Sequence, residues 1–306
     1  MFKKEIFAKI QVPAGEKVRI SDFDPGWKQV AELWSTERKP DEEATEFRAK
    51  KVLAESRTQL AEAQELLWAS DTYAILIILQ AMDAAGKDST IRHVMSGVNP
   101  QGCQVYNFKV PSEEELDHNF LWRHMKALPE RGRIGIFNRS YYEDVLVVKV
   151  HPEYLRKLPP GKVNKNFWNA RYEDINAFER HLTRNGTVIL KFFLNISKGE
   201  QRKRFLKRLN RADKHWKFSL SDMKERAYWD DYMKVFEDAL SATSTEWAPW
   251  YVIPADKKWA ARSIVAQIIT ATIQSLDLEY PEVTPEQTAQ FDEARRQLEN
   301  EANGPG

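Results

Sequence analysis

Tyr73-Ala-Ile-Leu-Ile-Ile-Leu-Gln80, continued by Ala81-Met-Asp-Ala-Ala-Gly-Lys-Asp-Ser-Thr-Ile91, is the most informative stretch of the chain. Its first part is apolar, rich in β-branched residues and without alternation, which is typical of a strand buried on both faces of a parallel sheet. The second part leaves this strand and opens a helix that runs through Val94. Backbone N–H groups at such a helix start face an anion, and Lys87 can reach bridging phosphate oxygens. The stretch therefore predicts a strand, a phosphate-binding loop and a helix.

The loop departs from the Walker A pattern at two positions. Ala81 stands where the pattern has Gly, and Asp88 stands where Ser or Thr follows the lysine. Ser89 and Thr90 supply hydroxyl groups one and two positions later. The alternative to a phosphate site is an ordinary turn between strand and helix with a solvated lysine. We favour the phosphate site because the Gly-Lys pair lies at the turn and hydroxyl groups follow it.

Asp83 is an unusual residue for a loop that holds phosphate. Its carboxylate would repel the ligand unless a cation lies between them. Mg²⁺ is the natural mediator, because it binds one or two carboxylates together with phosphate oxygens. The alternative is that Asp83 forms a turn by accepting a hydrogen bond from its own backbone.

A second polar group follows the third expected strand, in Ile134-Gly-Ile-Phe-Asn-Arg-Ser-Tyr-Tyr-Glu-Asp144. Asn138 and Arg139 come at the carboxyl end of that strand, the edge where α/β sheets bind ligands. Asn138 is neutral where a metal-binding acid is usual, so Glu143 is our candidate for balancing the metal charge. Arg139 can stabilise charge on a phosphoryl group in transfer. The alternative role of Arg139 is an ion pair with Glu143 or Asp144.

Four further stretches have the composition of strands, and helical patterns separate each from the next. They are residues 103–108, 133–137, 188–194 and 250–253. Strands that alternate with helices predict a parallel α/β sheet.

Several helices are marked in the sequence. Ser112-x-x-Glu115, Ser197-x-x-Glu200 and Ser219-x-x-Asp222 indicate helix starts, because the hydroxyl can cap a free N–H and the carboxylate favours the positive helix end. Residues 41–70 contain no Gly or Pro and predict an amphipathic helix of unusual length. Such a helix packs on the core or forms a dimer seam, and we favour the core because its spacings do not sustain a heptad.

The composition excludes several classes of protein. The chain has 306 residues, 46 Lys and Arg against 45 Asp and Glu, 42% hydrophobic residues and one Cys. It is too apolar for a disordered polymer, too poor in Cys for a disulfide scaffold, and too neutral for a generic nucleic-acid binder. A lone Cys103 favours a reducing, cytoplasmic setting. Residues 74–79, the longest apolar run, are much shorter than the roughly 20 residues of a membrane span, so we expect neither a membrane segment nor export.

Both ends of the chain differ from its centre. Residues 1–40 contain five Pro and Gly and no sustained periodicity, which indicates an extended arm that wraps the body or meets a partner subunit. Residues 281–306 form a polar tail that we expect to be frayed. The main domain therefore spans residues 41–280.

A basic segment follows the fourth expected strand. Residues 198–226 hold 11 Lys and Arg against 4 Asp and Glu, a net charge of +7. Arg204, Arg208 and Arg211 recur at steps of four and three and align along one helical face. Asp213-Lys-His-Trp-Lys-Phe-Ser219 then interrupts the helix before another begins. This order predicts a lid over residues 198–242 that closes on phosphates and excludes water, with a solvated helix face as the alternative.

Three motifs together resemble the second family of polyphosphate kinases. They are Asp83-Ala-Ala-Gly-Lys87, Phe137-Asn-Arg-Ser-Tyr-Tyr142 and Lys214-His-Trp-Lys217, and the similarity covers roughly residues 20–275. Residues 141–151 resemble the class III members in particular. The resemblance implies a three-layer α/β/α P-loop kinase fold, similar to thymidylate kinases, with a five-stranded parallel sheet and a helical lid. It also implies that inorganic polyphosphate is the donor, that nucleoside mono- and diphosphates are acceptors, and that Mg²⁺, or Mn²⁺ in its place, is required.

The resemblance also implies roles for individual residues. Asp83 and Lys87 are essential, Asp83 holds the metal and Arg139 serves the phosphates. Glu143 matches an acid of class III members where diphosphate-specific members tend to have Asn, and it is the second metal candidate. Further contacts to phosphate or nucleotide are expected from Ala84, Ala85, Gly86, Asp88, Ser89, Thr90, Lys109, Arg123 and Asn138, and lid contacts to polyphosphate from Arg204, Arg208, Lys214 and Lys217. Ser89 and Ala81 replace glycines usual in the family, which affects the fine geometry of the loop and relative rates.

The expected reaction is in-line transfer of the terminal phosphoryl group, without a covalent enzyme intermediate. The acceptor is already an oxyanion, so no strong general base is needed. His118, His124, His181 and His215 are accordingly interpreted as structural or lid residues. Trp68, Trp122, Trp168, Trp229 and Trp259 are interpreted as core.

Two other functions compete with this reading. An ATP-dependent nucleoside monophosphate kinase would share the loop, lid and metal. A P-loop regulator or nucleic-acid-binding module would use the basic helix pair, although we expect no nucleic-acid partner. The subunits are expected to form dimers or tetramers.

Overall fold

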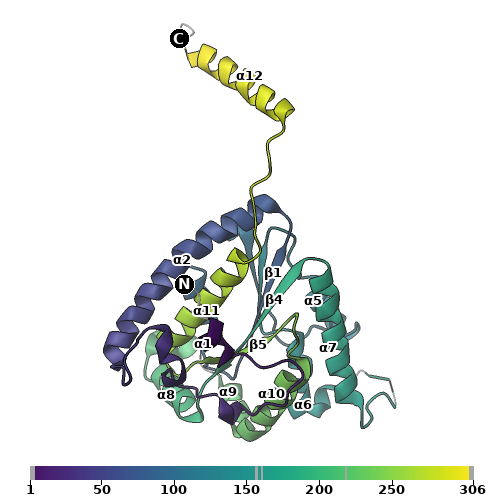
Figure 1. Cartoon of the computed structure of the whole chain (residues 1–306). Helices are drawn as coiled ribbons and strands as arrows, with labels where there is room; N and C mark the ends of the chain where they lie inside the picture. Colours follow the sequence, from purple (N-terminus) through teal and green to yellow (C-terminus); the bar gives the residue numbers. More distant parts are fainter. Residues whose placement is uncertain (1–3, 156–157, 160, 218, 303–306) are drawn as a thin grey trace.

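A single five-stranded sheet forms the centre of the protein (Figure 1). The computed structural model describes residues 4–155, 158–159, 161–217 and 219–302. The strands are β1 (Ala74–Gln80), β2 (Cys103–Asn107), β3 (Ile134–Asn138), β4 (Thr187–Asn195) and β5 (Trp250–Pro254). All their pairings are parallel, in the order β2-β3-β1-β4-β5. Every residue of the central strand β1 is buried, so the five predicted strands and the parallel α/β sheet are confirmed.

Helices cover both faces of the sheet, which gives three layers (Figure 1). On one face α2 (Glu42–Ser70) and α3 (Lys87–Val94) pack against α11 (Lys258–Gln274). On the other face lie α7 (Phe167–Arg184) and α10 (Trp229–Thr243), which contact each other. The apolar side of α2 is buried along α11, as the core-packed interpretation predicted.

The remaining elements are short or belong to the predicted lid and the two ends. They are α1 (Lys4–Ala8), η1 (Ile20–Asp22), η2 (Lys28–Leu33), η3 (Pro100–Gly102), α4 (Glu113–Leu116), α5 (Trp122–Met125), η4 (Tyr141–Asp144), α6 (Val147–Val150), η5 (Pro152–Leu155), α8 (Lys198–Leu209), η6 (Ala212–Lys217), α9 (Leu220–Ala227) and α12 (Pro285–Ala302). None of the helices in these described ranges is both long and apolar enough to cross a bilayer.

The predicted helix starts are confirmed by their caps. The Ser112 hydroxyl accepts from the N–H of Glu115, and the Glu115 carboxylate accepts from the N–H of Ser112, which is a complete capping box. Ser197 caps α8 in the same way, by accepting from Glu200 N–H. Ser219 caps α9 through the N–H of Ser221.

The N-terminal residues lie along the edge of β5. Val12 N–H donates to the Trp250 carbonyl at 2.9 Å, and Val252 N–H donates to the Ile10 carbonyl at 2.7 Å. Farther along, Trp27 and Trp34 pack on the Trp259 ring, with centroid distances of 5.5 and 5.3 Å. These contacts cover an edge strand that would otherwise be open to pairing with another chain.

The C-terminal segment is helical, and the expectation of a frayed tail was wrong. Figure 1 shows α12 standing away from the body at the end of an extended connection. Pro285 occupies its first helical position, where the missing N–H costs nothing. Thr284 Oγ1 accepts from Gln287 N–H, and Gln287 Oε1 accepts from Thr284 N–H. The pattern Thr284-Pro-Glu-Gln287 is a capping box, so the sequence did hold a signal for this helix.

The tryptophan expectations hold in part. Trp229 and Trp259 are buried, whereas Trp68, Trp122 and Trp168 are half-buried. A cation lies over each of these three rings: Arg133 over Trp68 at 4.5 Å, Lys126 over Trp122 at 4.2 Å and Lys149 over Trp168 at 5.8 Å. A helical pattern in the sequence predicts that a Trp ring is covered. It does not show whether an apolar side chain or a Lys or Arg side chain covers the ring, because both can do so.

Candidate active site

The loop between β1 and α3 curls so that Lys87 lies beneath it. Ala84 and Gly86 have left-handed backbone angles, with φ of 63° and 114°. Lys87 is 9% exposed, and its Nζ donates to the carbonyl of Ala81 at 2.8 Å. Burial lowers the pKa of Lys87, and the nearby Arg139 lowers it further. A bound phosphate would counter both causes, because it adds negative charge beside the ammonium group.

Arg139 lies between the two carboxylates that the sequence singled out. Its guanidinium is 2.9 Å from Asp83 Oδ1 and 3.7 Å from Glu143 Oε2. Glu143 is the main cause that raises the pKa of Arg139. The loop after β1 and the turn after β3 therefore meet at the carboxyl edge of the sheet. The alternative in which Arg139 pairs with Glu143 is realised together with the Asp83 contact.

The two carboxylates offer a partial set of ligands for a hard cation. Asp83 and Glu143 both contact one guanidinium, so their oxygens face the same small space. The described residues contain no group of three or more acidic, His or Cys side chains with metal-binding geometry. The two carboxylates by themselves suit Mg²⁺, which binds one or two carboxylates together with phosphate oxygens and water.

Asn138 holds the residue after the loop lysine. Its Nδ2 donates to Asp88 Oδ1 at 2.8 Å and to Asn107 Oδ1 at 2.5 Å. Asn107 and Asn138 are partners in the β2–β3 register, so both amides project from the same edge. Ser89, the next residue of α3, accepts from Arg262 Nη2 at 2.6 Å. Sequence reasoning missed Arg262, which lies 173 residues away on α11.

Arg204 does not occupy the lid position that the sequence predicted. It is buried, and its guanidinium donates to four backbone carbonyl groups. Those of Ala84 and Ala85 belong to the loop, and those of Ala255 and Asp256 follow β5. Its Nε pairs with Glu200 at 2.9 Å. The guanidinium therefore satisfies carbonyl groups of the loop, which have few other hydrogen-bond donors in a tight turn.

Helix α8, the first helix of the predicted lid, contacts both the loop and α9. Arg208 Nη1 is 3.4 Å from Asp222 Oδ2. Burial, followed by the nearby Asp83, raises the pKa of Asp222. Gln201 Nε2 donates to the Asp83 carbonyl at 2.9 Å, which links α8 directly to the loop.

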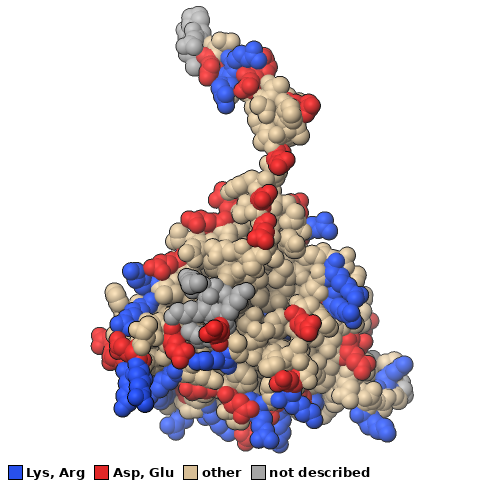
Figure 2. Space-filling model, viewed as in Figure 1, with Lys and Arg blue, Asp and Glu red and all other residues tan. Residues whose placement is uncertain are grey.

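The remaining predicted residues lie farther out. Lys214 pairs with Asp213 at 3.1 Å, and the side chain of Lys217 is outside the described residues. Lys109 is exposed, and its carbonyl accepts from Arg123 Nη1 at 2.9 Å. Arg123 packs over the Phe108 ring at 5.5 Å. Figure 2 shows Lys and Arg side chains gathered along the rim over α8 and α9.

A buried ion pair supports the turn that carries Glu143. Lys191 of β4 and Glu179 of α7 are fully buried and 2.6 Å apart. The hydroxyl groups of Tyr141 and Tyr142 both donate to Glu179 Oε1 at 2.8 Å. Sequence reasoning missed this network, although a single charge inside the apolar run of β4 was a signal for it.

Three of the four histidines that we interpret as structural or lid residues pack against rings or bond a backbone carbonyl group. His124 is buried beside Phe108, and burial lowers its pKa to about 3. His118 stacks on Trp122 at 3.8 Å, and His215 bonds the carbonyl of Leu209 in the lid. This agrees with the structural interpretation of these residues.

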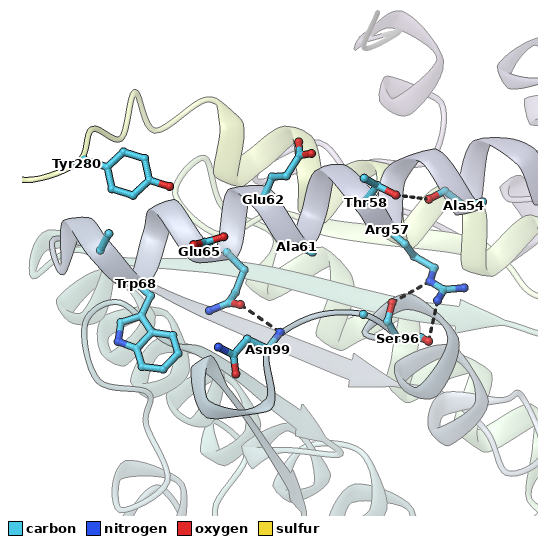
Figure 3. A pocket seen from close by; sticks show the side chains of 13 residues that line it. Ala54, Arg57, Thr58, Ala61, Glu62, Glu65, Trp68, Ser96, Asn99 and Tyr280 are labelled. Atoms are coloured by element: carbon cyan, nitrogen blue, oxygen red, sulfur yellow. Dashed lines mark hydrogen bonds between the residues drawn. The ribbon is translucent and has the colours of Figure 1, made fainter. Parts of the chain in front are cut away.

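A cavity lies elsewhere, along α2 (Figure 3). It has a volume of about 1010 Å³, and Trp68, Tyr280, Arg57 and Asn99 are among the residues that line it. It contains none of the loop or lid residues described above. We place the candidate active site at the loop because charged groups from three elements converge there, which the cavity on α2 does not offer.

The parallel sheet order and the lysine loop after β1 are those of a P-loop phosphotransferase. The sequence model of the polyphosphate kinase 2 family matches residues 43–281. The chain belongs to the polyphosphate kinase 2 family.

Named relatives and a solved structure agree with this family. An ADP-polyphosphate phosphotransferase of Rhodopseudomonas palustris is 51% identical over 287 residues, which are 92% of this chain and 99% of that protein. An AMP/ADP-polyphosphate phosphotransferase of Meiothermus ruber is 48% identical over 76% of this chain and 84% of that protein. The crystal structure of polyphosphate kinase 2 from Arthrobacter aurescens matches with a TM-score of 0.81 and 39% identity, over 97% of this chain and 99% of that one.

Proposed function

We propose that this protein transfers the terminal phosphoryl group of inorganic polyphosphate to nucleoside mono- and diphosphates. The observation that carries the proposal is the convergence of Lys87, Arg139 and two carboxylates at the carboxyl edge of the sheet. Family membership supports polyphosphate as donor, because the names of both curated relatives pair polyphosphate with an adenine nucleotide. The reaction is reversible, since a phosphoanhydride is broken and another is formed.

Asp83 and Glu143 are the residues that would hold a divalent cation, Mg²⁺ or Mn²⁺. Both provide the oxygen ligands that these ions prefer, and both face the loop. When bound, the ion neutralises charge on the phosphate oxygens and helps to orient them.

The side chains of this chain supply positioning and charge. Lys87 binds donor phosphate oxygens from beneath the loop, and Arg139 stabilises charge on the phosphoryl group between donor and acceptor. Closure of α8 and α9 brings Arg208 and Lys214 to the donor and excludes water. No protein nucleophile is needed, because the acceptor phosphate already presents an oxyanion.

The acceptor range is the finer part of the proposal. One of the two relatives is named for ADP and the other for both AMP and ADP. We infer that this chain accepts both, because Glu143 occupies the position where the resemblance to class III members places an acid. A cytoplasmic setting and assembly into dimers or tetramers belong to the same proposal.

The deciding experiment supplies the purified protein with Mg²⁺, long-chain polyphosphate and AMP, without ATP. Chromatography should then show ADP and ATP accumulating together. If only added ADP is phosphorylated, the inference from Glu143 is wrong and the donor assignment stands. If products form only with ATP as donor, the protein is an ordinary nucleoside monophosphate kinase.

A further inference from the structure

Gln80 ends the central strand at the edge of the sheet that carries the candidate active site. It is 1% exposed, and it is the only polar side chain of β1. A buried amide requires hydrogen-bond partners at both of its ends, because an unpaired polar group inside a protein is costly. The partners of Gln80 therefore indicate its role at this position.

Both ends of the Gln80 amide contact the turn that follows β3. The nitrogen donates to Glu143 Oε1 at 2.8 Å, and the oxygen accepts from the N–H of Ser140 at 3.0 Å and from its hydroxyl at 3.1 Å. In the opposite orientation the amide oxygen would face only acceptors and the nitrogen only donors, so hydrogen bonding decides which end faces the carboxylate. Gln80 therefore binds Glu143 directly.

The carboxylate of Glu143 is contacted at both of its oxygens. Oε1 accepts from Gln80, and Oε2 lies 3.7 Å from the guanidinium of Arg139. The amide of Gln80 fixes Oε1 but carries no net charge, so it leaves the negative charge of Glu143 available to a divalent cation. A lysine or arginine in its place would bind the carboxylate and cancel that charge. Gln80 therefore orients Glu143 without neutralising it.

The backbone on either side of Gln80 joins the acid to the phosphate loop. The N–H of Arg139 donates to the carbonyl of Leu79, the residue before Gln80, at 3.1 Å. The carbonyl of Ala81, the residue after it, accepts from Lys87 Nζ at 2.8 Å. The side chain of Gln80 therefore sets where the acid lies relative to the loop.

We propose that Gln80 is a positioning residue that holds Glu143 in place and thereby allows a nucleoside monophosphate to act as acceptor. The inference rests on the proposed function, in which Glu143 accounts for the use of AMP. A monophosphate offers fewer phosphate oxygens to the metal ion and the cations than a diphosphate does, so its transfer depends more on the exact position of each ligand. A displaced Glu143 should therefore impair the use of AMP more than the use of ADP.

The test is a double-mutant cycle of Gln80 and Glu143 in the full chain. Gln80→Met keeps the approximate length of the side chain but removes its hydrogen bonds, and Glu143→Gln removes the carboxylate. The two single variants and the double variant are assayed with polyphosphate and Mg²⁺, with AMP or ADP as acceptor. If Gln80 acts through Glu143, the two losses do not add, whereas independent residues give additive losses.

The matched control is Asn195→Leu. Asn195 is a buried amide at the end of β4, a strand next to β1, and its Nδ2 donates to the carbonyl of Phe23 at 2.8 Å. Its loss should lower the melting temperature as Gln80→Met does, without changing the ratio of kcat/KM for AMP to kcat/KM for ADP. If Gln80→Met does not fold, Gln80→Asn takes its place in the cycle, because it keeps the amide but is one methylene shorter.

Gln80→Met is expected to lower kcat/KM for AMP about tenfold, mainly through kcat, and kcat/KM for ADP less than about threefold, as the loss of one hydrogen bond to a charged group would do. In the Glu143→Gln background the same replacement should change the value for AMP by less than about twofold. Additive losses, equal losses for AMP and ADP, or a selective loss of AMP use in the control would overturn the positioning role.

The wild-type protein tests the proposed function separately. A wild-type protein that used no polyphosphate would refute the proposed function, whatever the variants did. If it used polyphosphate with ADP alone, the donor assignment would stand, and the acceptor range and the role of Gln80 would both be overturned.

Discussion

Charge balance at single residues shapes the active site. Arg139 has a left-handed backbone conformation with φ of 64°, which is unfavourable for a side chain of its size. This conformation directs the guanidinium between Asp83 and Glu143. Lys87 adds a buried ammonium group nearby. Without ligand, the positive charges of Lys87 and Arg139 nearly cancel the negative charges of Asp83 and Glu143. Bound phosphate would add negative charge, and a bound metal ion would add positive charge.

Replacement of Lys87 tests the loop directly. Lys87→Met keeps the length and apolar contacts of the side chain but removes the charge that faces phosphate. We expect kcat/KM with polyphosphate to fall at least about 100-fold, with the melting temperature nearly unchanged. Lys51→Met, on the exposed side of α2, is the control. Turnover near the wild-type value in Lys87→Met would remove this residue from the site.

Asp144 gives a prediction for the effect of pH on stability. Burial raises its pKa to about 6 from the usual 3.8, despite an Arg171 guanidinium 3.9 Å away. Between these pH values the folded protein binds the proton that the unfolded chain has lost. The free energy of unfolding should therefore fall as pH rises from about 4 to about 6, by up to about 3 kcal/mol.

The measurement is urea unfolding over that pH range for the wild type and Asp144→Asn. The variant should lose this part of the pH dependence, because asparagine does not ionise. Asp230→Asn, at an exposed position on α10, should keep it. An unchanged slope in Asp144→Asn would show that Asp144 ionises in the folded protein at its ordinary pKa.

At the scale of elements, α8 has two functions that its sequence pattern does not separate. Arg204 and Arg208 are one helical turn apart. Arg204 holds loop carbonyl groups from beneath, whereas Arg208 faces Asp222 of α9. The first interaction holds the loop, and the second joins the two helices of the proposed lid.

The two arginines should therefore respond differently to replacement. Arg204→Met should lower the free energy of unfolding by about 3 kcal/mol, because buried carbonyl groups lose a charged donor. Arg208→Gln should change it by less than about 1 kcal/mol, as expected for a partly exposed pair, and should raise KM for polyphosphate. Urea unfolding and donor titrations measure both quantities. Equal stability in the two variants would contradict the division of roles.

At the scale of the whole molecule, three long-range connections hold the body together. The N-terminal residues close the β5 edge, the Glu179–Lys191 pair joins α7 to β4, and α2 packs along α11. By contrast, α12 is exposed throughout its described side chains, including Phe291 at 54% and Leu298 at 66%. Its stability comes from local capping rather than from burial against the body.

Removal of residues 282–306 should leave the body intact. Because α12 buries no side chain on the sheet or its covering helices, we expect the melting temperature and kcat with polyphosphate to stay within experimental error. Calorimetry, steady-state kinetics and light scattering of the truncated chain provide the test. A large loss of stability at constant molecular mass would show that the segment packs on its own body in solution.

The sequence by itself determined the parallel sheet and the strand, turn and helix that form the loop. Residues 73–91 predicted a buried strand, a phosphate-binding turn and a helix, because burial on both faces and anion binding at a helix start are local properties of the chain. The helix caps and the alternative ion pair between Arg139 and Glu143 followed from the same kind of reasoning.

Only the tertiary structure decided the role of residues whose partners are distant in the chain. Arg204 is periodic with the lid arginines but binds carbonyl groups 51 and about 120 residues away. Arg262 reaches Ser89 across 173 residues, and Lys191 finds Glu179 inside the core. Periodicity identifies the face of a helix on which a side chain lies. The partner and the burial that set its energy depend on which elements the sheet order brings together.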